Sequence, residues 1–296
     1  MSATRRLRVL CNPTAGGGRA ARALSAVAHA LSAPGIEVRV DRTRSAEHAA
    51  ELARDAAQAG EEVVAFGGDG MARIAAHATR GTDAVLGVLP GGRGNDFART
   101  LGIPHDPIAA CRSLIDAPVR SIDVGDVDGA TFVGVASIGL ESEVTRIANA
   151  APRLGGAAVY AAATIAGLAR YRPARFSLTL DGEPREFTGY LVAAANSGRF
   201  GGGMRIAPDA RIDDGLLDVV VIEHGPRLRF MLNTPKVFKG THIHDPKVHV
   251  FRASEVRLDA NRPLEVYADG DEISATPAIA RAVPGALRVR APQHIT

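Results

Sequence analysis

Short apolar runs alternate with stretches of helical periodicity over the first third of the chain. The runs at residues 8–11, 36–40, 63–66 and 85–89 are predicted as buried strands. Apolar residues recur at helical spacing over residues 20–31, which end at Pro34-Gly35, and over residues 49–56, which end at Gly60. Because strands and helices alternate, we predict an α/β domain with a parallel sheet and flanking helices. The loops that follow such strands lie at one sheet edge, where ligands bind.

The pattern changes from about Ser121. Turn signals such as Asp181-Gly182 and Asp269-Gly270 separate β-rich runs, which predicts a second, mostly antiparallel β-sandwich. Helical interruptions are expected at about residues 140–170 and 226–240, where alternation with a period of two is missing. We therefore expect a first domain over residues 1–122 and a second over 123–296. The last strand is a candidate for a return to the first domain.

The composition is typical of a folded globular protein. Of the 296 residues, 46% are hydrophobic and 23% are charged, which argues against disorder, a collagen repeat and a coiled coil. Cys11 and Cys111 are the only cysteines and no charged-then-apolar leader opens the chain, so we expect a cytoplasmic protein without disulfides. The net charge of +3 is too even a balance to indicate nucleic-acid binding.

The basic residues are almost all arginines. The lysines are Lys236, Lys239 and Lys247, far from every glycine-rich loop. This excludes a Walker P-loop and a protein-kinase site, since both need a lysine at the phosphates. No apolar segment reaches the roughly 20 residues of a membrane-spanning helix. The longest uncharged run, residues 154–169 between Arg153 and Arg170, is expected to form a packed or surface helix.

Glycine-rich turns follow several of the predicted strands. The turn at residues 12–18 precedes a helix, so its N–H groups are suited to phosphate oxygens. Gly16, Gly18 and Ala21, with Asp41 further on, also satisfy the dinucleotide fingerprint, although that turn normally starts directly at the strand end and Pro13 lies between. A turn without any ligand is the third interpretation.

Two further turns are more specific. Gly67-Gly68-Asp69-Gly70 directly follows a buried strand, where glycines allow close approach of a phosphate chain and Asp69 can hold a metal through water. Residues 89–99 combine a strand end, a glycine turn and a helix start with Asn95 or Asp96 as the predicted cap. Loops of this kind at one sheet edge favour a nucleotide cleft.

These motifs resemble the diacylglycerol kinase catalytic domain family, which includes soluble bacterial lipid kinases and sphingosine kinases. The resemblance rests on the Asn-Pro-x-x-Gly-x-Gly start, the Gly-Gly-Asp-Gly loop, the Pro-x-Gly-x-x-Asn-Asp-Phe-Ala-Arg-x-Leu-Gly string at residues 90–102, and Asp123. It continues through Asn196, Gly201-Gly202-Gly203, Pro208-Asp209-Ala210, residues 213–218, residues 242–246 and Asp269-Gly270. It therefore covers nearly the whole chain in the family's order.

The resemblance implies an ATP-dependent lipid kinase with a nucleotide-binding α/β domain, a β-sandwich, and a lipid that enters between them. It implies that Asp69, with Asp96 and Asp123 nearby, organises the phosphate-side magnesium and that Asp269 is the general base. It implies a second, structural magnesium on the Asp214 carboxylate and the backbone carbonyls of Arg211 and Leu216. The remaining residues implied to contact ATP are Asn12, Gly16, Thr43, Gly67, Gly68, Gly70, Gly92, Arg93 and Asn95.

The residue types fit this chemistry, because phosphoryl transfer needs positioned phosphates, a metal and a base near the acceptor hydroxyl. Each site also has a plainer interpretation. Asp269-Gly270 suits an ordinary hairpin turn, and Asp213-Asp214-Gly215 a solvated turn whose oxygen ligands favour magnesium or calcium over zinc. The His-x-His spacing of His242 and His244, with His249 beyond, is a minor zinc alternative without a nearby cysteine.

The chain departs from the family pattern next to the phosphates. Met71-Ala72-Arg73-Ile74 replaces the usual Thr-x-Asn-Glu, and Gly92-Arg93 replaces the usual Gly-Thr. Arg73 or Arg93 is a candidate to contact phosphate in place of the lost groups. A chain that binds nucleotide poorly is the alternative.

The sequence thus predicts an ATP- and magnesium-dependent kinase for diacylglycerol or a related lipid alcohol. A catalytically impaired nucleotide- and lipid-binding homologue and a nicotinamide-binding oxidoreductase are the alternatives. We expect transient, peripheral contact with the inner membrane surface through residues 154–169, or through residues 226–239 with Leu228, Phe230, Met231 and Phe238. No nucleic-acid partner is expected, and formation of a homodimer stays open.

Overall fold

The chain forms two compact units in a computed structural model that describes residues 4–150 and 157–292. The first unit runs to Ile122 and resumes at Gly285, and the second is Asp123–Pro284. Strands β5 (Val119–Val127) and β17 (Ala278–Arg290) each begin in one unit and end in the other.

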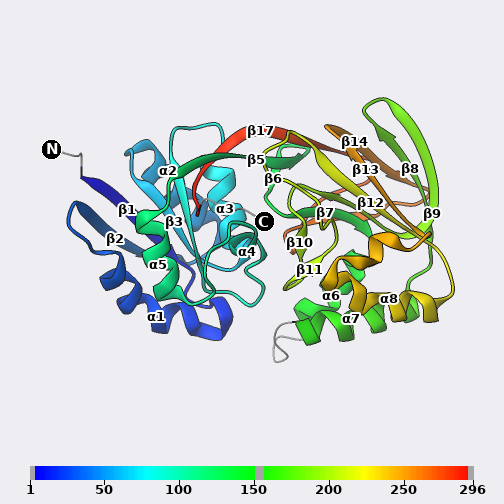
Figure 1. The fold of residues 1–296 in the computed structure, drawn as a ribbon, viewed down its shortest axis with the longest axis horizontal. Coiled ribbons are helices and arrows are strands. Elements are labelled where there is room, and N and C mark those ends of the chain that lie inside the picture. Colours follow the sequence, from blue (N-terminus) through cyan, green and yellow to red (C-terminus); the bar gives the residue numbers. More distant parts are fainter. Residues whose placement is uncertain (1–3, 151–156, 293–296) are drawn as a thin grey trace. The chain divides into compact units, whose positions relative to one another are not determined.

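A parallel sheet with helices on both faces makes up the first unit (Figure 1). Strand β1 (Arg5–Cys11) pairs with β2 (Ile36–Arg42) and β3 (Glu62–Gly67), and β4 (Val85–Pro90) pairs with β3 and with the end of β17. The inner strands are buried almost continuously rather than alternately, because helices cover both faces. The predicted strands and the α/β class are confirmed.

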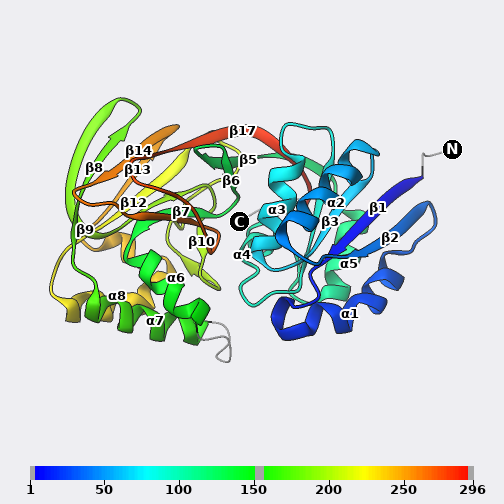
Figure 2. The same ribbon diagram turned by 180° about the vertical axis from the view of Figure 1, so that it is seen from behind.

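The helices of this unit pack in pairs. Helix α1 packs against α5, and α2 packs against α3, on opposite faces of the sheet (Figure 1, Figure 2). The helices are α1 (Ala15–Leu31), α2 (Ala46–Gln58), α3 (Asp69–Thr79), α4 (Asp96–Thr100) and α5 (Pro107–Asp116).

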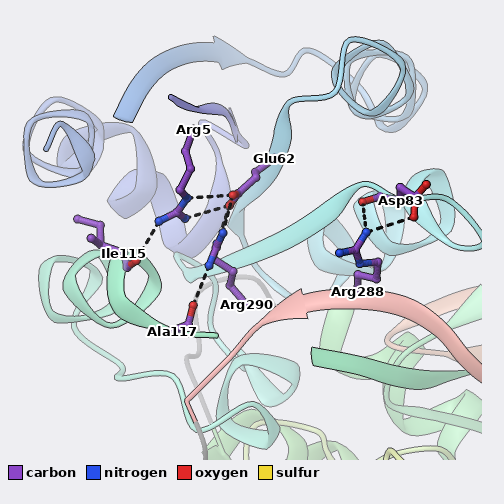
Figure 3. Close-up of polar contacts among 7 residues, drawn as sticks. All are labelled: Arg5, Glu62, Asp83, Ile115, Ala117, Arg288 and Arg290. Atoms are coloured by element: carbon purple, nitrogen blue, oxygen red, sulfur yellow. Dashed lines mark hydrogen bonds and ion pairs between the residues drawn. The ribbon is translucent and has the colours of Figure 1, made fainter. Parts of the chain in front are cut away.

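Ion pairs attach the end of β17 to the first unit (Figure 3). The Glu62 carboxylate accepts two hydrogen bonds from Arg290, both of 2.7 Å, and two from Arg5, of 2.9 and 3.0 Å. Arg290 and Arg5 also donate to the Ala117 and Ile115 carbonyls. Burial would raise the pKa of Glu62, but the hydrogen bonds from Arg290 and Arg5 outweigh burial and hold it below its usual range. The last strand is therefore held by buried charge as well as by the sheet ladder.

The second unit is an antiparallel β-sandwich. Its main sheet has the order β16-β15-β7-β9-β8-β14-β17, and β12 joins β9 to β13. Alternate residues of these strands form one apolar core that includes Phe132, Phe176, Val219 and Leu258. The strands are β6 (Ala130–Phe132), β7 (Val135–Gly139), β8 (Ala174–Leu180), β9 (Glu183–Ala195), β10 (Arg199–Phe200), β11 (Met204–Arg205), β12 (Leu217–Glu223), β13 (Val248–Ala253), β14 (Glu255–Ala260), β15 (Glu265–Ala268) and β16 (Asp271–Ala275).

Helices α6 (Leu140–Ala150), α7 (Ala157–Arg170) and α8 (Arg227–Lys239) lie together on the second unit (Figure 1, Figure 2). They confirm the predicted helical interruptions. A second apolar cluster, which includes Leu140, Val144, Leu168 and Tyr190, fastens them to the sheet. The uncharged run falls mainly on α7, and residues 154–156 lie outside the described part. No described helix is long and apolar enough to cross a membrane.

Candidate active site

The glycine-rich loops of the first unit meet at the carboxyl ends of its parallel strands. The Gly67 carbonyl accepts hydrogen bonds from Gly91 N, at 2.7 Å, and from Gly92 N, at 3.0 Å. A Cβ atom on Gly92 would come within 2.4 Å of the Gly68 Cα, so only glycine allows the loops after β3 and β4 to approach this closely. The sequence motifs therefore converge as predicted for an α/β sheet.

The loop after β1 joins the same edge. Asn12 N donates to the Phe66 carbonyl at 3.0 Å, and the Asn12 Oδ1 accepts from Thr14 N at 3.1 Å. Gly16–Gly18 all have positive φ, from 59° to 85°, and the regular helix starts only after them. A Cβ on Gly16 would lie 2.4 Å from the Gly91 carbonyl, and Arg19 donates to the Gly92 carbonyl at 2.7 Å.

Two sequence candidates near this loop have structural partners. Thr43 is buried after β2, where its N–H and hydroxyl donate to the Cys11 carbonyl at 2.9 and 3.3 Å. Asp41, the acidic residue of the dinucleotide interpretation, accepts a hydrogen bond from Arg8 at 2.8 Å. Thr43 therefore ties the loop after β2 to the end of β1. The Asp41 carboxylate is already hydrogen-bonded to Arg8.

Helix α3 begins at the Gly-Gly-Asp-Gly loop. Its N-cap residue is Gly68, which has no side chain to accept from the first-turn N–H groups. Those N–H groups and the helix dipole favour an anion at this end of the helix. Gly67, Gly68 and Gly70 thus form the part of the edge best suited to a phosphate.

The Asp69 side chain links the loops after β3 and β4. Its Oδ1 accepts from Phe97 N at 3.1 Å, in the first turn of α4. Burial raises the pKa of Asp69, and backbone hydrogen bonds from Phe97, Asn95 and Asp96 oppose that rise. This carboxylate supplies the side-chain cap of α4.

The prediction that Asn95 or Asp96 caps α4 is confirmed for the position of the cap, but not for its side-chain hydrogen bond. Asn95 occupies the N-cap position with φ of 56°, but its side chain makes no capping hydrogen bond. Instead its Oδ1 accepts from Gly92 N at 2.8 Å, and its Nδ2 donates to the Gly92 carbonyl at 3.0 Å. Asp96 is buried in the first turn and lies 3.5 Å from Arg99. Asn95 therefore holds the glycine turn closed while Asp69 caps the helix.

The residues that depart from the family pattern lie beside these loops. Met71 is buried in the first turn of α3. A Cβ atom added to Gly67 would lie 2.7 Å from the Cβ atom of Met71. Arg73 is half-buried on α3, and Arg93 is exposed on the loop after β4. Arg93 has no hydrogen-bond or ion-pair partner among the described residues, which leaves its guanidinium available to a phosphate.

Asp269 occupies the turn after β15 in the second unit. Its φ is 51°, and its carboxylate accepts from Val133 N at 2.8 Å, Gly134 N at 2.9 Å and Val135 N at 3.2 Å. A Cβ on Gly134 would lie 2.4 Å from the Asp269 Oδ1. Backbone groups therefore fix this carboxylate in one position, which an ordinary hairpin turn does not require.

Glu141, in the first turn of α6, is not among the residues predicted from the sequence. Burial raises the pKa of its carboxyl to about 7, the Ser137 hydroxyl partly offsets this, and the charge of Asp269 raises it further. The carboxyl therefore lies within electrostatic reach of Asp269. An acidic residue two positions after a strand end was the only local signal, and it carries little weight alone.

The predicted structural metal position has partners within the chain. The Asp214 Oδ1 accepts from Leu216 N at 3.1 Å, and its Oδ2 pairs with Arg252. The Arg211 side chain donates to Asp213 at 3.1 Å. Magnesium at Asp214 would have to displace the Arg252 guanidinium. No group of three or more histidine, cysteine or acidic side chains suited to a metal occurs among residues 4–150 and 157–292.

Asp123 belongs to the second unit, where it holds this same turn. Its Oδ2 accepts from Gly215 N at 2.7 Å, and its N–H donates to the Ile212 carbonyl at 2.7 Å. Among the histidines, His242 is buried and its Nε2 lies 3.0 Å from the Ile206 carbonyl, whereas His249 lies beside Glu223. His242 and His249 therefore have separate partners.

Comparisons with known proteins agree along the whole chain. Residues 6–127 match the diacylglycerol kinase catalytic domain, and residues 134–291 match the YegS C-terminal NAD kinase beta sandwich-like domain. A diacylglycerol kinase of Mycobacterium tuberculosis (strain CDC 1551 / Oshkosh) is 36% identical over 295 residues, covering 96% of this chain and 94% of that protein. A diacylglycerol kinase of Bacillus subtilis (strain 168) is 29% identical, covering 90% of each chain.

A crystal structure of a diacylglycerol kinase from Bacillus anthracis str. Sterne shares the fold, with a TM-score of 0.79, 22% identity and full coverage of both chains. The chain belongs to the family defined by the diacylglycerol kinase catalytic domain. It is a lipid kinase. The predicted family and fold class are confirmed, and the oxidoreductase alternative is excluded.

Proposed function

We propose that this lipid kinase transfers the γ-phosphate of ATP to a hydroxyl of diacylglycerol or a related lipid alcohol, with magnesium. The observation that carries this proposal is the convergence of the glycine-rich loops at one edge of the first unit. Its relatives named diacylglycerol kinase support the acceptor class.

On the nucleotide side, the phosphates would lie against the N-terminus of α3. Asn12, Thr43, Gly67, Gly68 and Asn95 would shape the cradle, mainly through backbone groups and the turns that they hold. The other proposed contacts are Gly16, Gly70, Gly92 and Arg93. Fixed N–H donors of this kind position a phosphate chain without any movement at the time of reaction.

The carboxylates of Asp69 and Asp96 fit magnesium, because both lie at this edge and hard oxygen ligands are what magnesium prefers. Magnesium would neutralise charge on the phosphates. Asp69 also orders the β4 loop through Phe97 N, so its substitution affects the cradle as well as the metal.

On the acceptor side, Asp269 would accept the hydroxyl proton as the oxygen attacks the γ-phosphorus and ADP leaves. Its three backbone donors hold the carboxylate in place, which suits a positioned base. Asp269 would therefore touch the reacting atoms.

The test is turnover of Asp269→Asn with ATP, magnesium and diacylglycerol micelles. We expect at least a roughly hundredfold loss of kcat with unchanged ATP binding, the scale of a positioned general base. Asp271→Asn, which removes a neighbouring exposed carboxylate, is the matched control. Near-normal turnover of Asp269→Asn would remove Asp269 from the mechanism. Wild-type protein that binds ATP but phosphorylates no lipid alcohol would favour the impaired homologue instead.

We further propose that α8 touches the membrane. Leu228, Met231 and Leu232 are exposed on it, whereas Phe230 packs edge-on against Tyr190 and Phe238 is half-buried. The free cations of this helix are Arg227, Lys236 and Lys239, which have no ion-pair partner among the described residues. Apolar side chains beside basic ones suit a shallow, reversible contact with anionic lipid.

A further inference from the structure

An apolar pocket lies beneath the helices of the second unit. It leaves about 60 Å³ that a water-sized sphere can enter, within about 540 Å³ of unfilled space that includes open solvent, and its walls come from α6, α7, α8 and the strands β9 to β12. Leu140, Leu191, Met204, Ile206 and Phe230 are among the lining side chains. An apolar lining of this kind is suited to part of a hydrocarbon chain, which would extend through the open side of the pocket.

Among the described side chains that line this pocket, Glu141 is the only ionisable one. Its Oε2 is buried and has no hydrogen-bond partner within residues 4–150 and 157–292. A buried oxygen without a partner lowers stability, so such a group is commonly kept for a ligand. Glu143, one half-turn further on α6, instead pairs with Arg146 at 2.6 Å.

We propose that the protonated Glu141 carboxyl donates a hydrogen bond to an ester or hydroxyl oxygen of the acceptor lipid, whose hydrocarbon chain occupies the apolar pocket. This proposal rests on the proposed lipid kinase reaction and adds a residue that selects the acceptor. Glu141 binds substrate in this proposal, and proton removal stays with Asp269.

The surroundings of Glu141 favour its neutral form. Ser137 faces it from β7, and Asp269 affects it from the turn after β15. The described side chains of the other pocket elements are Thr164, Thr234 and apolar residues, and none of them is a cation that could stabilise a carboxylate. Burial therefore raises the pKa of Glu141 to about 7, so the donor is present in acid and at neutral pH and is lost in alkali.

The consequence is a pH-dependent KM for lipid. Above about pH 7 the carboxyl loses its proton, so it no longer donates a hydrogen bond, and a lipid chain in the pocket would have to cover an unpaired charge. Wild-type KM for dioctanoylglycerol in mixed micelles should rise roughly tenfold between pH 6 and pH 8.5, with a smaller change in kcat. Glu141→Gln keeps a donor that cannot ionise, so its KM should stay nearly constant over this range.

The experiment compares Glu141→Gln, Glu141→Leu and the control Glu143→Gln across this pH range. Glu141→Leu should raise KM about tenfold at pH 6, and Glu143→Gln should follow the wild type. A KM for Glu141→Gln that rises with pH as in the wild type would overturn the proposal. So would a Glu141→Leu variant that melts normally and has wild-type KM at pH 6.

A second measurement does not depend on phosphoryl transfer. Binding of a fluorescent diacylglycerol analogue, without ATP, should weaken with pH in the wild type and not in Glu141→Gln. Binding with that pattern in a protein that shows no turnover would support the role of Glu141 and contradict the proposed function. Equal binding by wild type and Glu141→Leu at pH 6 would contradict the role of Glu141 whatever the activity.

Discussion

Two partly buried glutamates, one in each unit, have opposite surroundings. Glu62 in the first unit accepts four hydrogen bonds from Arg5 and Arg290, and its pKa is lowered because they outweigh its burial. Glu141 in the second unit lines an apolar pocket, and burial raises its pKa to about 7. The first arrangement stabilises the fold, and the second lowers stability while it leaves a proton donor for a ligand.

Glu62 and Glu141 show how a carboxyl that stabilises the fold differs from one proposed to bind a ligand. Both side chains are carboxyls at strand or helix ends, so residue type does not distinguish them. What distinguishes them is whether a cation from another element reaches the carboxylate. Substitutions at each position should therefore change stability in opposite directions.

The largest change in the free energy of unfolding is expected for substitution of Glu62. Glu62→Gln leaves two arginines partly buried without their carboxylate, so the free energy of unfolding should fall by about 3 kcal/mol. Urea denaturation followed by circular dichroism measures this change. Glu37→Gln, on the exposed side of β2, is the control and should change the free energy by less than about 0.5 kcal/mol. Equal midpoints for the two variants would show that the cluster does not stabilise the fold.

The Glu62 cluster also has a defined pH dependence. Because the pKa of Glu62 is lower in the folded state than in the unfolded chain, its contribution is present above the unfolded pKa of about 4.5. That contribution is lost as the pH falls through the folded pKa. Glu62→Gln should therefore lose less stability than the wild type on acidification below about pH 4.5.

Substitution of Glu141 should change the free energy of unfolding in the opposite direction. Glu141→Leu should raise the free energy of unfolding by about 2 kcal/mol at pH 8, because the folded-state pKa of Glu141 lies near 7 and the unfolded value near 4.5. In the wild type, the contribution of Glu141 to stability should be most favourable below about pH 4.5. It should be lost as the pH rises to 7. Thermal melting from pH 5 to pH 8 checks the prediction. Destabilisation at pH 8 would mean that Glu141 has a structural partner.

The sequence predicted the scaffold of the first unit better than the environments of its side chains. The strands β1, β3 and β4 are buried on both faces, so each is a continuous apolar run that needs no tertiary information. The convergence of their loops follows from parallel topology. One local signal was incomplete: Asn95 is an acceptable cap residue, but the capping hydrogen bond of α4 comes from Asp69 on α3.

In the second unit the sequence predicted helices but not the faces they expose. Phe230 and Leu232 lie two residues apart on α8, so they point to nearly opposite sides of the helix. Phe230 packs on Tyr190 of β9 and Leu232 is exposed, and this tertiary partner decides which side is covered. Glu141 was missed for the same reason. Its pocket is built from segments up to Val237, so no local pattern marks it.

A smaller effect is expected at Asp214, whose carboxylate already pairs with a cation as Glu62 does. We propose that magnesium binds the Asp214 carboxylate together with the carbonyls of Arg211 and Leu216. It would compete with Arg252 for the carboxylate. At ten times its Kd, magnesium should then stabilise the wild type by about 1.4 kcal/mol. Asp214→Ala should lose this gain, whereas Asp213→Ala should keep it. If magnesium does not change the melting curve of the wild type, the Asp214 carboxylate pairs with Arg252 and binds no magnesium.

The smallest effects should come from the unpaired cations of α8, which contrast with the paired arginines of the Glu62 cluster. Removing Lys236 or Lys239 should weaken binding to phosphatidylglycerol vesicles by about 1 kcal/mol each, roughly fivefold, and leave folding unchanged. Leu228→Ser should weaken binding without changing its salt dependence, because it removes insertion rather than charge. Val250→Ser, at an exposed apolar position on β13, is the control. Co-sedimentation that is equal on anionic and neutral vesicles, or absent from both at low salt, would contradict a membrane role for α8 and leave its exposed leucines as ordinary surface residues.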